Sequence, residues 1–90
     1  MTRAHVIIKG RVQGVCYRAF TQEVAIKLGL TGWVKNKRDG TVEAVFDGER
    51  DKIDEAIKLC WQGPSLAHVS DIQIEWQEID KAHPDFRITN

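Results

Sequence analysis

The segment that most constrains this chain is Gly10–Arg18, which separates a short β-branched run from the first helical pattern. Residues 4–9 are rich in valine and isoleucine, as in a strand, and apolar residues from Tyr17 to Leu28 recur at helical spacing. A loop between a strand and a helix can curl so that successive backbone N–H groups point inward and bind an anion. The positive end of the helix adds to this attraction. The segment therefore predicts a strand-loop-helix unit with an anion-binding nest.

Two residues of this segment suit such a nest. Gly14 adopts backbone conformations that are closed to other residues. Arg18 lies at the start of the predicted helix, from where its guanidinium can reach back and pair with a phosphate through two hydrogen bonds. The alternative interpretation is a plain strand-to-helix turn with a surface arginine. The glycine pattern alone does not separate the two interpretations.

Strands and helices continue to alternate after the first helix. Residues 30–36 and 41–47 are predicted strands, joined by a hairpin turn over Lys37–Gly40 that contains an Asp-Gly pair. An amphipathic helix follows, with acidic residues at its start and Gly63-Pro64 at its end. The chain thus repeats the unit with which it begins.

Two more strands are predicted near the C-terminus, over residues 71–78, where apolar and polar residues alternate, and over residues 86–88. Two helices are too few to cover both faces of a sheet. We therefore predict an α/β (α+β) sandwich with the ferredoxin-like βαββαβ topology, an antiparallel sheet and both helices on one face. No linker divides the chain, so residues 1–90 are expected to form a single domain.

The distribution of charge along the chain and the number of cysteines limit the functions that are compatible with the sequence. The net charge is zero, but residues 1–38 carry eight Lys or Arg and one acidic residue, against five and twelve in the rest. A basic half attracts anionic ligands, unless charges of both signs mix on the folded surface. Cys16 and Cys60 are too few for a disulfide scaffold or a zinc site. We expect two free thiols, with a bridge between them as the alternative.

Several sequence features that would indicate a membrane location, secretion or nucleic-acid binding are absent from the sequence. It contains neither the roughly 20 apolar residues of a membrane span nor a recognisable signal peptide. Trp33 and Trp76 fall on predicted strands and Trp61 at a helix end, without the aromatic strand motif that stacks on RNA bases. We therefore expect a cytoplasmic monomer with no membrane and no nucleic-acid partner, whose tryptophans serve packing.

Two stretches resemble the signatures of the acylphosphatase family. They are G-R-V-Q-G-V-C-Y-R, from Gly10 to Arg18, and G-W-V-K-N-K-R-D-G-T-V-E-A-V-F-D-G, from Gly32 to Gly48, and the likeness extends to F-R-I near the C-terminus. The resemblance implies that Arg18 and Asn36 are catalytic, with the substrate phosphate in the loop and the attacking water held by Asn36. The implied loop residues are Gln13, Gly14, Val15, Cys16, Tyr17 and Arg18. Tyr17 stands where the family commonly has Phe, which leaves every implied catalytic group in place.

The substrate that this resemblance implies is a small acyl phosphate, a mixed anhydride of a carboxylate and phosphate. Its carboxylate leaving group has a pKa of about 4 and departs without a general acid. Phosphoryl transfer is loose, so a strong base is not essential, and a phosphate oxygen of the substrate can take the proton of the water. Positioning and charge stabilisation are left to the protein. We therefore expect neither a cofactor nor a metal, and His5, His68 and His83 lack metal-ligand spacing.

Three alternatives are weighed against this interpretation. Cys16 lies in the loop, but the longer Cys-to-Arg spacing that wraps a phosphate between a thiolate and a guanidinium is absent, so we expect a bystander. Lys35, Lys37 and Arg38 lie beside Asn36 in the sequence, and they either belong to a solvated hairpin or attract an anionic substrate. The rival function is a non-catalytic ferredoxin-like module that binds an anion or a partner. Such a module would not turn over an acyl phosphate.

Overall fold

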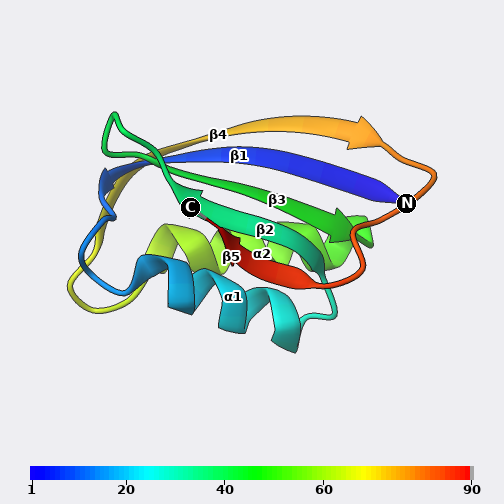
Figure 1. The fold of residues 1–90 in the computed structure, drawn as a ribbon, viewed down its shortest axis with the longest axis horizontal. Coiled ribbons are helices and arrows are strands. Elements are labelled where there is room, and N and C mark those ends of the chain that lie inside the picture. Colours follow the sequence, from blue (N-terminus) through cyan, green and yellow to red (C-terminus); the bar gives the residue numbers. More distant parts are fainter. Residues whose placement is uncertain (90) are drawn as a thin grey trace.

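The computed structural model describes residues 1–89 and consists of one five-stranded sheet with two helices packed on the same face (Figure 1). The strand order across the sheet is β4-β1-β3-β2-β5. This is the predicted sandwich, and the helices and strands follow one another in the predicted order. Their bounds are β1 Thr2–Arg11, α1 Tyr17–Lys27, β2 Thr31–Asn36, β3 Val42–Gly48, α2 Arg50–Gln62, β4 His68–Glu78 and β5 Phe86–Thr89.

The sheet is mixed, which corrects the expectation of a wholly antiparallel sheet. Strand β1 pairs antiparallel with β3 and β4, and β2 pairs antiparallel with β3, but β5 pairs parallel with β2. The short connection after β4 reverses the chain, and β5 then joins the far edge, beside a strand that already runs in its direction. The backbone N–H of Gly32 donates to the carbonyl oxygen of Asp85 at 2.8 Å, where this parallel pairing begins. The last strand therefore lies next to the strand that ends at Asn36.

The core lies between the sheet and the helices. Alternate residues of the central strands face the helices, and the strand register places apolar side chains beside one another, as in the pairs Ala4–Phe46 and Val6–Ala44. Phe46 stacks on Phe86 of β5 with ring centroids 5.7 Å apart. Removing this apolar surface from water is the main favourable contribution to folding. The buried strand residues on this face are Ala4, Val6, Ile8, Val34, Val42, Ala44, Phe46, Ile72 and Phe86.

The edge strand β4 buries less of its apolar face than its alternating sequence suggests. Ile72 is buried, but Ile74 is 40% exposed because β4 has a neighbouring strand on one side only. Trp76 packs at the margin of the core, and the guanidinium of Arg50 lies 3.6 Å from its ring centroid. The packing role that we expected for Trp76 is confirmed.

Strand β1 extends through Gly10 and Arg11, so the loop before α1 is shorter than the sequence predicted. The pairing of β1 with β4 shifts in register between Lys9 and Gly10, where Gly10 has a φ of 126°. A Cβ atom at Gly10 would lie 2.1 Å from the carbonyl oxygen of His68, so only glycine fits this bulge. Gly10 therefore serves the sheet, and the loop begins at Val12.

A buried carboxylate anchors the connection to β5 on the face opposite the helices. The side chain of Asp47 is fully buried and accepts hydrogen bonds from Arg3 Nε at 2.7 Å and Nη2 at 2.9 Å. It also accepts one from the backbone N–H of His83 at 3.0 Å and contacts His83 Nδ1 at 2.7 Å. Burial opposes ionisation of Asp47, but the hydrogen bonds from Arg3 and His83 outweigh it and hold the pKa below its ordinary value.

The Asp47 contacts predict a loss of stability in acid. Because the pKa of Asp47 is lower in the folded than in the unfolded chain, its stabilisation is present above the ordinary value of 3.8 and is lost as the pH falls through the folded-state pKa. We expect Asp47→Asn to lower the free energy of unfolding by roughly 2–4 kcal/mol at neutral pH. The difference from the wild type should shrink toward a pH of about 2. Urea unfolding at the two pH values measures both quantities.

The control is Asp54→Asn, which removes an exposed partner of Arg50 on α2 and should change stability little. A difference between the wild type and Asp47→Asn that stays the same at both pH values would show that ionisation of Asp47 has no part in it.

Candidate functional site

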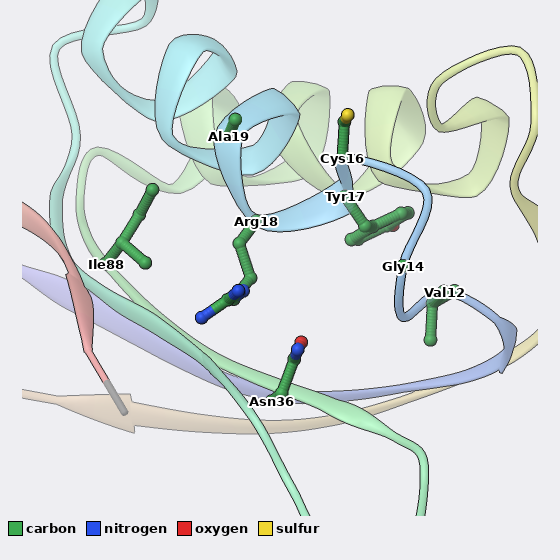
Figure 2. A pocket seen from close by; sticks show the side chains of 8 residues that line it. All are labelled: Val12, Gly14, Cys16, Tyr17, Arg18, Ala19, Asn36 and Ile88. Carbon is green, nitrogen blue, oxygen red and sulfur yellow. The ribbon is translucent and has the colours of Figure 1, made fainter.

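A cavity of about 370 Å³ opens where β1 gives way to α1 (Figure 2). The loop before α1 and the first turn of α1 form one side of it. Strand β2 contributes its last residue and β5 its third. Among the described residues that line the cavity, Arg18 alone is charged. The lining residues are Val12, Gly14, Cys16, Tyr17, Arg18, Ala19, Asn36 and Ile88.

Arg18 and Asn36, the two residues implied to be catalytic, project into this cavity from opposite walls (Figure 2). Arg18 comes from the first turn of α1 and Asn36 from the end of β2. The Oδ1 atom of Asn36 is buried and has no hydrogen-bond partner among the described residues. A buried acceptor without a partner is rare and costs about 1–3 kcal/mol. The cavity is therefore lined by one guanidinium and by one amide whose buried oxygen lacks a donor among the described residues.

The loop before α1 has the backbone conformation of an anion nest. Gly14 has a φ of 74°, and Cys16 is left-handed with φ 64° and ψ 25°, followed by the right-handed residues of α1. A left-handed residue next to a right-handed one turns successive N–H groups to the same side. The Cys16 side chain makes no capping hydrogen bond, and the first turn of α1 carries no acidic residue. Its N–H groups are thus placed to attract an anion.

The predicted loop residues divide between the cavity and the rest of the fold. Gly14, Cys16, Tyr17 and Arg18 line the cavity, whereas Val15 is buried in the core. The sulfur of Cys16 points away from Arg18 and Asn36 (Figure 2).

Tyr17 occupies a position where the family that the sequence resembles commonly has Phe. The fold accommodates the additional hydroxyl because this group forms a hydrogen bond. It donates to the carbonyl oxygen of Cys60 at 2.5 Å, near the end of α2. Burial raises the pKa of the Tyr17 hydroxyl well above its ordinary value, so the group stays protonated. Its ring can therefore line the cavity while its polar end is satisfied inside the fold.

Gln13 has a structural role that the sequence did not indicate. Its Nε2 atom donates to the carbonyl oxygens of Lys37 at 2.7 Å and Thr41 at 2.8 Å. Lys37 follows Asn36 directly, and its own N–H donates to the same carbonyl of Thr41 at 2.9 Å. The Gln13 side chain therefore ties the loop before α1 to the base of the hairpin that carries Asn36. Its acceptors lie 24 and 28 residues away, so no local pattern identifies them.

The remaining cysteine and histidine contacts complete the inventory of titratable groups. Cys16 and Cys60 are both free thiols, which excludes the alternative of a bridge, and burial raises the pKa of Cys60 to about 12. His5 contacts Glu43 at 2.6 Å on the sheet. Within residues 1–89, no three His, Cys, Asp or Glu side chains gather to hold a metal ion. None of the helices in this range is both long and apolar enough to cross a membrane.

Comparison with known proteins agrees with the geometry. The family model described as Acylphosphatase matches residues 4–88. An acylphosphatase of Pelotomaculum thermopropionicum is 48% identical over 86 residues, which cover 96% of this chain and 94% of that protein. The crystal structure of the acylphosphatase from Bacillus subtilis matches with a TM-score of 0.97 at 34% identity, over 100% of both chains. An acylphosphatase structure from Coxiella burnetii matches with a TM-score of 0.91 at 42% identity, over 98% of this chain and 92% of that one.

The contacts of Gln13 predict a measurable contribution to stability. Gln13→Ala removes two hydrogen bonds and leaves two carbonyl oxygens without that donor, so we expect the free energy of unfolding to fall by roughly 1–3 kcal/mol. Gln22→Ala is the matched control, because Gln22 donates a single hydrogen bond to the carbonyl of Phe86 at 3.1 Å. It should cost about 1 kcal/mol or less. Urea unfolding compares the two, and a smaller loss for Gln13→Ala than for Gln22→Ala would contradict the bridging role.

Proposed function

This chain belongs to the acylphosphatase family, and from that premise we propose that the cavity between α1 and β2 is its active site. Arg18 and the loop of residues 13–18 bind the phosphoryl group of an acyl phosphate, and Asn36 holds the attacking water. The observation that carries the proposal is that Arg18 and Asn36 line one cavity, although they come from different elements.

Phosphate binding rests on the charge and shape of the nest. The Arg18 guanidinium pairs with two phosphoryl oxygens, and the N–H groups at the start of α1 bind the others. These donors are fixed by the backbone before substrate arrives, so little reorganisation is needed when charge develops in the transition state. Since Arg18 is the one charged lining residue of the described chain, the anion meets no opposing carboxylate in the cavity.

In the proposed reaction, the water bound by Asn36 attacks phosphorus while the bond from phosphorus to the acyl oxygen breaks. The bonding electrons leave with the carboxylate, and the proton of the water passes to a phosphoryl oxygen. The side-chain amide of Asn36 holds the water by a hydrogen bond, so that a lone pair of the water faces phosphorus. The described lining residues include no carboxylate and no imidazole, which suits a reaction that relies on the substrate itself as base.

Metal independence follows from the same chemistry, because a carboxylate is a good leaving group and the positive charge comes from Arg18. Turnover of a synthetic acyl phosphate in the presence of a chelator separates this enzyme from the non-catalytic anion-binding module, which would show none.

The cytoplasmic location and the monomeric state remain predictions.

Arg18→Ala tests the phosphate site. Loss of the Arg18 guanidinium should lower kcat/KM for an acyl phosphate by about a thousandfold or more and abolish competitive inhibition by inorganic phosphate. Arg11→Ala, which removes an exposed arginine at the end of β1, is the matched control and should keep near-normal kinetics. Unchanged inhibition by phosphate in Arg18→Ala would place the anion elsewhere.

Asn36→Ala tests the role of the amide. We expect kcat to fall by roughly a hundred- to a thousandfold while the inhibition constant of phosphate changes by about twofold or less, because the nest and Arg18 are intact. Steady-state kinetics with phosphate as inhibitor separate the two effects. A large rise in the inhibition constant would mean that Asn36 binds the phosphoryl group and not the water.

A further inference from the structure

Ile88 is an apolar side chain that faces the cavity although its strand is built to pack against the core. On β5, Phe86 and Ile88 project to the same face of the sheet, because side chains alternate along a strand. Phe86 is buried against Phe46, whereas Ile88 is 40% exposed. At Ile88 the face opens into the cavity beside the first turn of α1 (Figure 2). The apolar surface of this residue is therefore presented to whatever occupies the cavity.

We propose that Ile88 and Ala19 form the surface that receives the acyl group of the substrate. The enzyme should then favour acyl phosphates with an apolar acyl group over those with a small or a charged one. This inference rests on the function proposed above, since it assumes that the phosphoryl group occupies the nest. It makes Ile88 a specificity-determining residue supplied by the last strand of the sheet.

The direction of the acyl group follows from the shape of the site. The backbone of the loop closes one side of the nest, so a group attached to the phosphoryl oxygen projects from the other side. Ile88 bounds the cavity on that side, beyond Arg18 as seen from the loop (Figure 2), and Ala19 lines the cavity from the first turn of α1. An acyl group there would cover apolar surface that is otherwise exposed to water, which favours binding.

The size and charge of the cavity fit a small apolar substituent. Its volume of about 370 Å³ lies at the lower end of the roughly 300–1,000 Å³ that small-molecule sites enclose, which leaves room for a group beyond the phosphoryl. Arg18, the one charged lining residue within residues 1–89, is engaged by the phosphoryl group in the proposed complex. An acyl group with a second carboxylate would therefore lose water against Ile88 without gaining a partner, at a cost in free energy.

The test compares benzoyl phosphate with acetyl phosphate in Ile88→Ala. Benzoyl phosphate has a large apolar acyl group and acetyl phosphate a small one. We expect kcat/KM for benzoyl phosphate to fall roughly five- to tenfold, mainly through KM, because the contact is apolar and partly open to water. For acetyl phosphate the fall should be about twofold or less, and inhibition by inorganic phosphate should persist.

Ile74→Ala is the matched control, since Ile74 is also 40% exposed but lies on β4 at the opposite edge of the sheet. We expect Ile74→Ala to change kcat/KM for neither benzoyl phosphate nor acetyl phosphate. Ile88→Lys should in addition raise the kcat/KM for succinyl phosphate, which carries a second carboxylate, relative to that for benzoyl phosphate. Both Ile88 variants are checked for folding by urea unfolding.

Equal changes for benzoyl and acetyl phosphate in Ile88→Ala, or no change for either, would overturn the assignment of the acyl surface while the proposed function stands. The proposed function fails in a different way, by the absence of wild-type turnover with both acyl phosphates.

Discussion

The candidate site depends on two hydrogen bonds that one carboxamide donates. The Gln13 side chain joins the loop before α1 to the carbonyls of Lys37 and Thr41, at the base of the hairpin that follows Asn36. This bridge connects the loop before α1 to the end of the strand that carries Asn36. A site that works by positioning is sensitive to a separation of its parts, since a displacement of about 1 Å can cost about a hundredfold in rate. Gln13 thus contributes by keeping the two proposed catalytic residues in fixed positions relative to each other.

A second polar anchor acts at the other end of the sheet. Asp47 is fully buried among Arg3 and His83 and holds the connection that leads from β4 to β5. That connection determines where β5 joins the sheet, and β5 carries Ile88 to the cavity. A carboxylate far from the proposed chemistry therefore helps to form one wall of the site. In a chain of 90 residues with a small core, each such contact is a considerable part of the total stability.

The sparse chemistry of the cavity matches the reaction proposed for it. One guanidinium, one amide and a curl of backbone suffice when the leaving group is a carboxylate and the transition state is loose. Apart from these groups, the cavity is lined mainly by apolar side chains. In the proposed complex, these apolar side chains form the surface that distinguishes one acyl group from another. Binding of the phosphoryl group and selection of the acyl group would then fall to different walls of one cavity.

Much of this protein follows from its sequence. The alternation of Val42, Ala44 and Phe46 predicts a strand with one core face, and glycine and apolar spacing locate both helices, because these signals depend on neighbours along the chain. The family signatures likewise point to Arg18 and Asn36 as a pair. The tertiary structure alone decided that β5 runs parallel to β2, that Asp47 is buried, that Gln13 bridges to the hairpin and that Ile88 reaches the cavity. Each of these depends on contacts between residues far apart in the chain, and the burial and hydrogen-bond partners that settle them exist only after the sheet has assembled.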